Sequence, residues 1–345
     1  MRSRAFLYRL AIFFTICSLF YSEASFPCSA IARQTATGAQ IVAANFDWRA
    51  RGGIVYLSPR GQIKETSLRR VTSKELGIPW VSKFASLTVS QFGRDYPMQG
   101  INEMGLMGAV LVAPAAYPHS GGQGLITENL WLQYQLDRYA SVEDVVKHIG
   151  DLGIRKISAD LHWFLCDASG ECVVVEFESS GPRVFRSRNM HEQVLTNSPV
   201  SESWQHYRSW KASDAEVPRG YGSLARFIRL ALSQLAESHN GVVDTLNDVA
   251  LDNFTAWQSV FDLRSRTFRI RQWGGYFQKI SFYGLPLRCS RVLPVFNLSD
   301  RIWQPYDPVK TNEILHDATQ GLPMKEIQAI EAASKRAEDV RCVEN

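Results

Sequence analysis

The chain has 345 residues, of which 45% are hydrophobic and 21% are charged, and its formal net charge is +4. This composition is typical of a globular protein with one large core or two domains. The charge is close to zero and no basic residues cluster, which excludes a nucleic-acid binder, so we expect a small molecule as the partner.

The first 27 residues predict a secretory signal followed by a short pro-segment. Three arginines precede an apolar run over residues 10–20, which is too short to span a bilayer. Small residues at Ser22 and Ala24 are typical of a signal-peptidase site. Residues 25–27 would then remain ahead of Cys28, and we attribute their removal to self-cleavage by that cysteine. A lipoprotein signal is disfavoured because residues 25–27 lack the small side chains that lipidation needs.

Export and a single domain follow from the rest of the chain. The mature protein is expected to be periplasmic in a Gram-negative bacterium and secreted otherwise. No later apolar stretch is long enough for a membrane helix, which predicts no stable membrane insertion. Residues 28–345 contain no repeat, low-complexity tract or long polar linker, so we predict one domain there.

The first part of the mature chain is predicted to form one or two sheets, and the later part adds helices. Short apolar or alternating segments indicate strands at 40–45, 54–58, 86–92 and 106–112, and residues 118–124 indicate a flexible loop. Helices are predicted at 128–139 after a Thr127 cap, 142–149 after a Ser141 cap, near Ser223, and 323–338. Hairpins are predicted around 167–171 and 264–266, so we expect a layered domain of strands and helices.

The cysteines indicate one free thiol. Five of the six remain in residues 28–345, and an odd number in an exported protein leaves one unpaired. Cys166 and Cys172 could bridge across a hairpin, and Cys289 and Cys342 remain as a second pair. Cys28 is the candidate free thiol. At a mature N-terminus it carries its own α-amine, whose pKa of about 7.7 to 8.0 suits a base, so no catalytic histidine would be needed.

Several separated segments resemble the choloylglycine hydrolases, which include bile salt hydrolases and penicillin V acylases. They occur in the family's order and cover most of residues 28–345. The segments are Cys28-Ser29-Ala30-Ile31, Asn45-Phe46-Asp47-Trp48, 100–106, 195–199 and 223–227.

This resemblance implies an α+β fold, a four-layer αββα sandwich of the N-terminal nucleophile hydrolase type. Two antiparallel sheets would pack between helices, and the nucleophile would begin a strand. Relatives also imply a homo-oligomer, a tetramer. The sequence has no metal-ligand cluster or nucleotide fingerprint, so we expect neither a metal nor a cofactor.

The resemblance also implies catalytic roles. The Cys28 thiolate would attack an amide carbonyl and form an acyl-thioester while its own amine relays the proton. Asp47 would orient that amine. Asn102, through its backbone N–H, and Asn197, through its side-chain amide, would stabilise the oxyanion. The positive charge of Arg226 would favour the thiolate.

Two further features bear on activity and substrate. The family usually has an arginine near the thiol at the position of Ala44, and Arg49 is the nearby cation that could compensate. Trp48, Phe92 and Tyr96 are candidates to line an apolar acyl pocket, because aromatic side chains offer large areas for stacking.

We therefore expect an exported amidohydrolase that cleaves linear amide bonds of N-acyl compounds such as conjugated bile salts, penicillin V or N-acyl homoserine lactones. One alternative is a non-catalytic exported binding protein of the same fold, which Ala44 would suit. Another is a papain-like cysteine peptidase, which needs a histidine partner. The chain has seven histidines but no cysteine-peptidase signature around Cys28.

Overall fold

The computed structural model describes residues 28–66, 77–118, 124–190, 192–233, 239–290, 293–337 and 340–343. The predicted signal and pro-segment, and most of the predicted loop at 118–124, lie outside the described residues. Export and cleavage before Cys28 therefore stay predictions.

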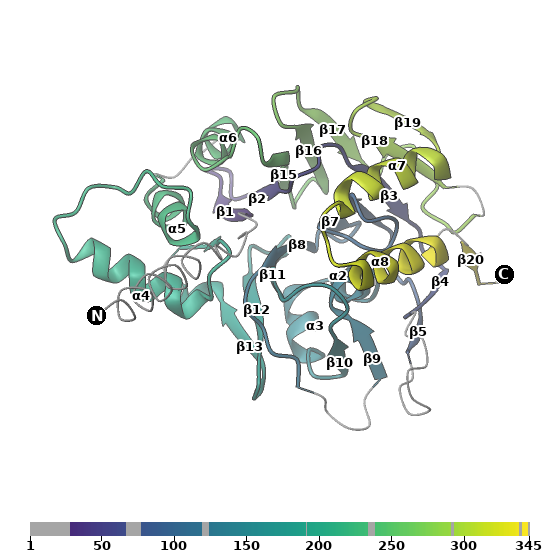
Figure 1. The fold of residues 1–345 in the computed structure, drawn as a ribbon, viewed down its shortest axis with the longest axis horizontal. Helices are drawn as coiled ribbons and strands as arrows, with labels where there is room; N and C mark the ends of the chain where they lie inside the picture. The colour runs from purple at the N-terminus through teal and green to yellow at the C-terminus, as the bar shows by residue number, and fades with distance from the viewer. Residues whose placement is uncertain are drawn as a thin grey trace, which may run out of the picture.

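Two antiparallel sheets form the centre of the molecule (Figure 1). In the six-stranded sheet the order is β14 (Val194–Leu195), β1 (Ser29–Gln34), β2 (Gln40–Asp47), β15 (Thr255–Asp262), β16 (Thr267–Gln272) and β17 (Gln278–Ser281). In the nine-stranded sheet the order is β13 (Gly181–Arg186), β12 (Cys172–Glu178), β11 (Leu161–Cys166), β8 (Met107–Val112), β7 (Gln99–Asn102), β6 (Ser86–Ser90), β3 (Ile54–Ser58), β18 (Pro294–Asn297) and β19 (Ile302–Pro305).

Apolar side chains from both sheets share one core, which explains why central strands such as β2 and β3 are buried along their whole length. Two smaller sheets lie outside this pair. One joins β9 (Gly124–Thr127) to β10 (Leu152–Arg155), and the other joins β4 (Gln62–Glu65) to β5 (Pro79–Val81) and β20 (Arg341–Cys342).

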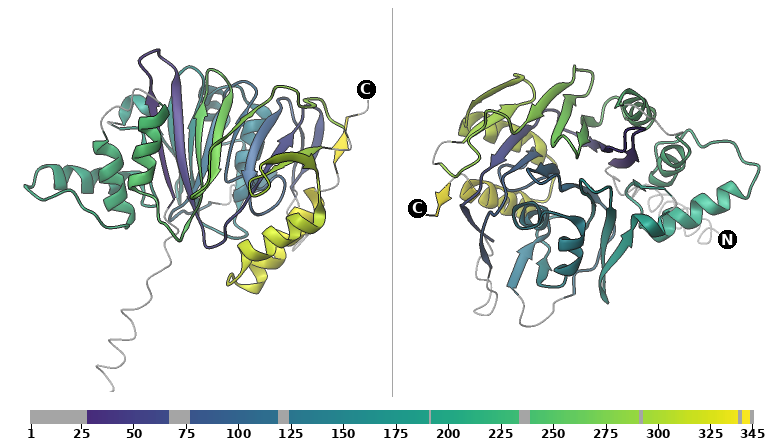
Figure 2. Two further views of the ribbon diagram at one scale, coloured as in Figure 1. Left: turned by 90° about the horizontal axis from the view of Figure 1, so that it is seen from above. Right: turned by 180° about the vertical axis from the view of Figure 1, so that it is seen from behind.

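Helices cover the outer faces of the two sheets (Figure 2). The nine-stranded sheet packs against α2 (Glu128–Arg138), which is followed by α3 (Val142–Lys147). The six-stranded sheet packs against α5 (Ser223–Leu232) and α6 (His239–Asp248), and α4 (Val200–Lys211) packs on α5. The C-terminal part adds α7 (Pro308–Thr319) and α8 (Met324–Ala337). The predicted four-layer arrangement is confirmed.

Local signals placed some helices well and missed others. The Thr127 and Ser141 side chains accept hydrogen bonds from the N–H groups of the first turns of α2 and α3, as predicted. Helix α3 is two residues shorter than expected, because the His148 N–H turns back to the Val145 carbonyl and ends the helix. Helices α4, α6 and α7 were not predicted. None of the helices in the described ranges is both long and apolar enough to cross a membrane.

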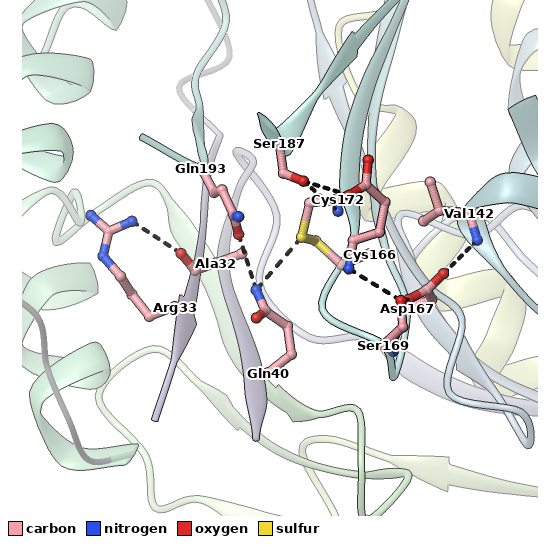
Figure 3. Close-up of a disulfide and its surroundings, with 11 residues drawn as sticks. Ala32, Arg33, Gln40, Val142, Cys166, Asp167, Ser169, Cys172, Ser187 and Gln193 are labelled. Atoms are coloured by element: carbon pink, nitrogen blue, oxygen red, sulfur yellow. Dashed lines mark hydrogen bonds between the residues drawn. A yellow bond between two sulfur atoms is a disulfide. The ribbon is translucent and has the colours of Figure 1, made fainter. Parts of the chain in front are cut away.

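Both predicted disulfides form. Cys166 and Cys172 face each other across the β11–β12 hairpin and are bonded, and the Gln40 side chain of β2 donates to Cys172 Sγ at 3.6 Å (Figure 3). This contact joins the two sheets at one end. Cys289 bonds Cys342, and Cys28 is the free cysteine among those described.

The two disulfides are expected to stabilise the fold unequally. Cys289–Cys342 spans 53 residues and Cys166–Cys172 spans 6. Loop-closure entropy then predicts that replacing the first pair by alanines costs about 4 kcal/mol of unfolding free energy and replacing the second about 2 kcal/mol. Urea unfolding of the two double variants measures this. An equal or reversed order would contradict an origin in loop entropy.

Candidate functional site

The β1–β2 hairpin brings Cys28 and Asp47 together. Cys28 directly precedes β1, Asp47 ends β2, and the register pairs Ser29 with Asn45. The Cys28 sulfur lies 3.9 Å from the Asp47 backbone oxygen. Both residues are buried, with 4% and 0% of their surfaces exposed. A sequence separation of 19 residues is thus converted into direct contact by strand pairing.

The buried position opposes ionisation of the thiol. Burial and the nearby Asp47 charge raise the pKa of Cys28 to about 12, while a backbone hydrogen bond and the Arg226 charge lower it. The thiol is therefore protonated at neutral pH in this arrangement. Attack by sulfur requires a base that can remove its proton.

The Asp47 carboxyl has one bonded oxygen and one open oxygen. Thr255 Oγ1 donates to Asp47 Oδ1, whereas no donor among the described residues reaches Oδ2. Burial raises the pKa of Asp47 to about 7, against the Thr255 hydrogen bond and the Arg226 charge, which lower it. Asp47 Oδ2 is an acceptor held close to Cys28.

Thr255 positions Asp47, which gives a testable effect on pH dependence. Its hydroxyl donates to Asp47 and accepts from the Leu251 N–H at 2.8 Å. Thr255→Val removes a hydrogen bond that favours the carboxylate, so the pKa of Asp47 should rise further. We expect turnover to fall about tenfold and the acid limb of the kcat–pH profile to move to higher pH. Thr255→Ser should restore both, and a purely structural role would leave the profile in place.

Arg226 connects the nucleophile to Asn197. From the first turns of α5 its Nη1 donates to the Cys28 carbonyl at 2.6 Å and to Ser29 Oγ, and its Nη2 donates to Asn197 Oδ1 at 2.8 Å. The side chain is fully buried, and burial lowers its pKa to about 10, against the Asp47 and Cys28 charges, which raise it. It stays cationic at neutral pH. Its guanidinium holds the Cys28 carbonyl and acts on the sulfur through its charge.

The Asn197 amide is held at both ends. Its Nδ2 donates to the Val112 carbonyl at 2.8 Å, and its Oδ1 accepts from Arg226. One N–H of the amide has no acceptor among the described residues, and 8% of the residue remains exposed. The geometry leaves this N–H available to a ligand near Cys28.

Asn102 is not brought to this group, which corrects the predicted oxyanion role. Its backbone N–H donates to the Leu106 carbonyl, and its side chain binds the Leu136 and Tyr139 carbonyls and the Met104 and Leu106 N–H groups. It fixes the β7–β8 turn. Strand β8 runs from that turn for about 17 Å, at about 3.4 Å per residue, before Val112 reaches the cavity that Cys28 lines.

The structure also defines the surroundings of the position where the family usually has arginine. Ala44 is fully buried and paired with Ala30 and Ser259 in the neighbouring strands. Arg49 does not replace the missing cation near the thiol, because its guanidinium donates to the Gln320 carbonyl between α7 and α8. Arg226 is the cation whose charge lowers the pKa of Cys28.

Cys28 lines an apolar cavity of about 130 Å³. The three predicted aromatic residues all lie in its wall: the Trp48 and Phe92 rings meet edge to face at 5.4 Å, and Phe92 and Tyr96 are 5.8 Å apart. The other lining residues were not predicted from the sequence; they are Phe46, Met98, Val110, Val112, Asn129, Ser158, Ala159, Leu161, Leu322, Glu326 and Ile330. Among them, Phe46 could have been identified from the sequence, because it lies in the Asn45-Phe46-Asp47-Trp48 segment that resembles the family.

Helix α8 and the turn before it close one side of the cavity. Leu322, Glu326 and Ile330 contribute this wall. The helix packs against Gly93, whose positive φ of 94° and lack of a side chain allow Ser334 to approach, since a Cβ there would clash with Ser334 Oγ. No group of three or more potential metal ligands occurs among the described residues.

A family model described as linear amide C-N hydrolases, choloylglycine hydrolase family, matches residues 28–219. The match begins at Cys28 itself.

Two curated relatives share part of the chain. A penicillin V acylase from Pectobacterium atrosepticum is 30% identical over 143 residues, which are 36% of this chain and 38% of the relative. A bile salt hydrolase/transferase from Clostridium perfringens is 28% identical over 188 residues, which are 50% of this chain and 54% of the relative. The matched stretches thus span about two-fifths and about half of these relatives.

Solved structures share the fold over more of the chain. A penicillin V acylase from Agrobacterium tumefaciens aligns with a TM-score of 0.68 at 22% identity, covering 81% of this chain and 98% of that one. A variant of conjugated bile acid hydrolase from Clostridium perfringens aligns with a TM-score of 0.65 at 20% identity, covering 81% and 97%. The predicted fold class is confirmed.

Proposed function

Because the chain belongs to the choloylglycine hydrolase family of linear amide C-N hydrolases, we propose that it hydrolyses the amide bond of a small N-acyl compound with Cys28 as the nucleophile. The observation that carries this proposal is the contact of the buried Cys28 sulfur with the Asp47 backbone oxygen, beside an apolar cavity and on a residue whose carboxyl oxygen Oδ2 has no partner among the described residues. The reaction is cofactor-independent.

Cleavage before Cys28 supplies the missing base. A peptide nitrogen cannot accept the thiol proton, whereas a free α-amine with a pKa of about 7.7 to 8.0 can. The open Asp47 Oδ2 accepts a hydrogen bond from that amine and orients its lone pair toward the sulfur. Positive charge on the amine and on Arg226 then favours the thiolate, which offsets the burial that raises the pKa of Cys28.

Acyl transfer proceeds through a thioester. The thiolate attacks the amide carbonyl carbon, and the free N–H of Asn197 donates to the oxyanion that forms. When the C–N bond breaks, the protonated Cys28 amine returns its proton to the leaving nitrogen. Water, deprotonated by the same amine, then attacks the thioester, releases the carboxylic acid and regenerates the thiol.

The substrate is proposed from the cavity and the relatives. Conjugated bile salts, penicillin V and N-acyl homoserine lactones all carry an apolar acyl group on a linear amide. Ligand pockets are commonly about 300 to 1,000 Å³, so a cavity of about 130 Å³ favours a compact acyl group over a steroid nucleus. The aromatic wall of Trp48, Phe92 and Tyr96 suits such a group by area and stacking.

Trapping the thioester tests the proposal. The purified protein is incubated with each of the three substrate classes, amine release is measured, and intact mass spectrometry of quenched samples detects the acyl adduct. We expect hydrolysis of at least one substrate, an adduct on Cys28 and an N-terminus at residue 28. Cys28→Ala is the control and should show neither adduct nor turnover. Undiminished hydrolysis by that variant, or an active protein that keeps residues upstream of 28, would refute the mechanism.

The same experiment separates the alternatives. A non-catalytic binding protein, which Ala44 would suit, binds an N-acyl compound without adduct or amine release. A papain-like peptidase needs a histidine at the thiol, and none of the described histidines lines the Cys28 cavity. His162 instead lies in a buried pair with Glu176 at 3.3 Å.

We also propose that the protein is exported. The two disulfides support this, because such bonds persist mainly in oxidising compartments outside the cytosol. Cell fractionation with N-terminal sequencing tests it, and a cytosolic protein that keeps residues 1–27 would contradict it.

A further inference from the structure

The acyl cavity has a polar corner, and its other polar lining residue is Glu326 on the α8 side of a mostly apolar wall. Tyr96, Asn129 and Ser158 form this polar corner, and all three line the cavity with Cys28. They come from three separate segments: the turn between β6 and β7, the first turn of α2, and the loop before β11. Polar side chains that converge from different segments in a ligand cavity usually fix a ligand's orientation.

A buried carboxylate holds the polar corner rigid. Glu128 is 0% exposed, and its Oε1 accepts from Ser158 N at 2.7 Å, Ser158 Oγ at 2.9 Å, Ala159 N at 3.2 Å and Asn129 Nδ2 at 3.0 Å. Its Oε2 accepts from Ile157 N at 2.9 Å. The loop therefore wraps around one fixed carboxyl group, which sets the positions of Ser158 and Asn129 before any ligand arrives.

The hydrogen-bond donors and acceptors of the polar corner can be assigned one by one, and one acceptor is left without a donor. Ser158 donates its hydroxyl proton to Glu128, so its oxygen accepts from the Tyr96 hydroxyl at 3.1 Å. The Asn129 Nδ2 group faces Glu128 Oε1, the Tyr96 hydroxyl and Ser158 Oγ. An amide oxygen in that place would face Glu128 Oε1, which already accepts from the Ser158 and Ala159 N–H groups, so the orientation of the amide is fixed. Every donor of the corner is then committed.

Asn129 Oδ1 is the group that remains. No donor in the described part of the chain lies within hydrogen-bonding distance of this oxygen. Asn129 lines the cavity, and 2% of the residue's surface is exposed. A purely apolar acyl group would strip this oxygen of water without replacing the hydrogen bond, which is unfavourable. A group that carries an O–H or N–H would satisfy it.

We propose that Asn129 is a specificity-determining residue that selects acyl groups bearing a hydrogen-bond donor, such as a hydroxyl, over counterparts that lack one. This inference rests on the proposed function, because the acyl group occupies the cavity while it is attached to Cys28. The polar corner offers an acceptor and no spare donor, so a fluoro or methoxy substituent should gain nothing from it.

Matched arylacetyl amides of one chromogenic amine test the inference. The series comprises phenylacetyl, its three ring-hydroxyl isomers, and the fluoro and methoxy analogues of each isomer. We expect kcat/KM for the best hydroxyl isomer to exceed those for the parent and its fluoro and methoxy analogues at least tenfold. Asn129→Leu, or Asn129→Ala should the leucine variant not fold, should bring these ratios close to one. Met98→Leu alters the same wall without a hydrogen-bonding group and should preserve them.

Measuring the binding of free acids tests the inference even when the protein does not hydrolyse the amides. If the protein hydrolyses neither these amides nor any of the three substrate classes named above, the proposed function fails, and calorimetry with the free arylacetic acids still reports on the cavity. The hydroxylated acid should then bind at least tenfold more tightly than phenylacetic acid, and the difference should vanish in the Asn129 variants. Equal values for donor-bearing and unsubstituted compounds, or a preference that persists in those variants, would overturn the inference.

Discussion

Replacing Asp47 by asparagine is expected to lower kcat by about 10² to 10³-fold and, in the uncleaved chain, to raise stability near neutral pH. Oriented proton transfer contributes on the order of 10² to 10⁴ in rate, and an amide cannot hold the Cys28 amine as a carboxylate does. Amine release under single-turnover conditions measures the loss. Acylation at the wild-type rate would remove Asp47 from the mechanism.

The stability effect follows from the raised pKa. The pKa of Asp47 is about 7 in the fold and 3.8 ordinarily, so between these values the unfolded chain has lost a proton that the folded chain keeps. Stability contributed by the neutral carboxyl is full below about pH 4, falls as the pH rises toward 7, and is constant above it. An asparagine side chain does not titrate. The free energy of unfolding of Asp47→Asn relative to the parent should therefore increase as the pH rises from about 4 to about 7, by on the order of 2 kcal/mol or more.

Urea unfolding at about pH 4 and about pH 8 in a Cys28→Ala background makes this comparison, since that background cannot cleave itself. Ser82→Ala serves as the matched control, because Ser82 is also buried with an unpaired hydroxyl but does not ionise. Its effect should be the same at both pH values. An Asp47→Asn difference that does not grow with pH would contradict the raised pKa.

Arg226→Met should lower kcat by at least about 10³-fold, the larger of the two catalytic effects. The variant loses the contacts to the Cys28 carbonyl and to Asn197, and it leaves the Asp47 carboxyl without the charge that lowers its pKa. The thiol pKa should rise as well, because the Arg226 charge lowers it. Arg226→Lys keeps the positive charge but loses the two guanidinium nitrogens that bind the Cys28 carbonyl and Asn197 together. Relative to Arg226→Met, it should therefore restore the thiol pKa more fully than it restores turnover.

The rate of thiol alkylation against pH measures the thiol pKa independently of turnover. Arg229→Met is the control, since Arg229 lies one turn further along α5 and binds the Pro218 and Gly220 carbonyls and Asp248. It should leave the alkylation profile nearly unchanged. An unchanged profile in Arg226→Met would show that its charge does not act on the sulfur.

The sequence predicted well where one segment carries its own signal. The caps at Thr127 and Ser141 place α2 and α3, because a hydroxyl that accepts from the first turn is a local interaction. The hairpin around residues 167–171 places Cys166 opposite Cys172 for the same reason. The resemblance then supplied the layered fold that such local signals could not assemble.

Site residues were predicted poorly where their role depends on which end of a strand lies at the cavity. Asn102 ends β7 just before the turn into β8, and Val112 ends β8, so the two residues lie at opposite ends of that strand. Hydrophobic periodicity does not show which of the two ends faces the cavity. Only the packing of the two sheets shows that Val112 reaches the cavity while Asn102 holds the opposite turn.

By itself the amino-acid order gave Cys28 as the candidate free thiol and Cys166–Cys172 and Cys289–Cys342 as the candidate pairs, since each rests on short-range pairing or on counting. The β1–β2 hairpin that brings Asp47 to Cys28 was not predicted and is seen only in the structure. The tertiary structure decided that Arg226 bridges Cys28 and Asn197, that α8 closes the cavity, and that Asn129 presents an unused acceptor in it. These groups come from distant parts of the chain, and their meeting depends on how sheets and helices pack, which no local propensity encodes.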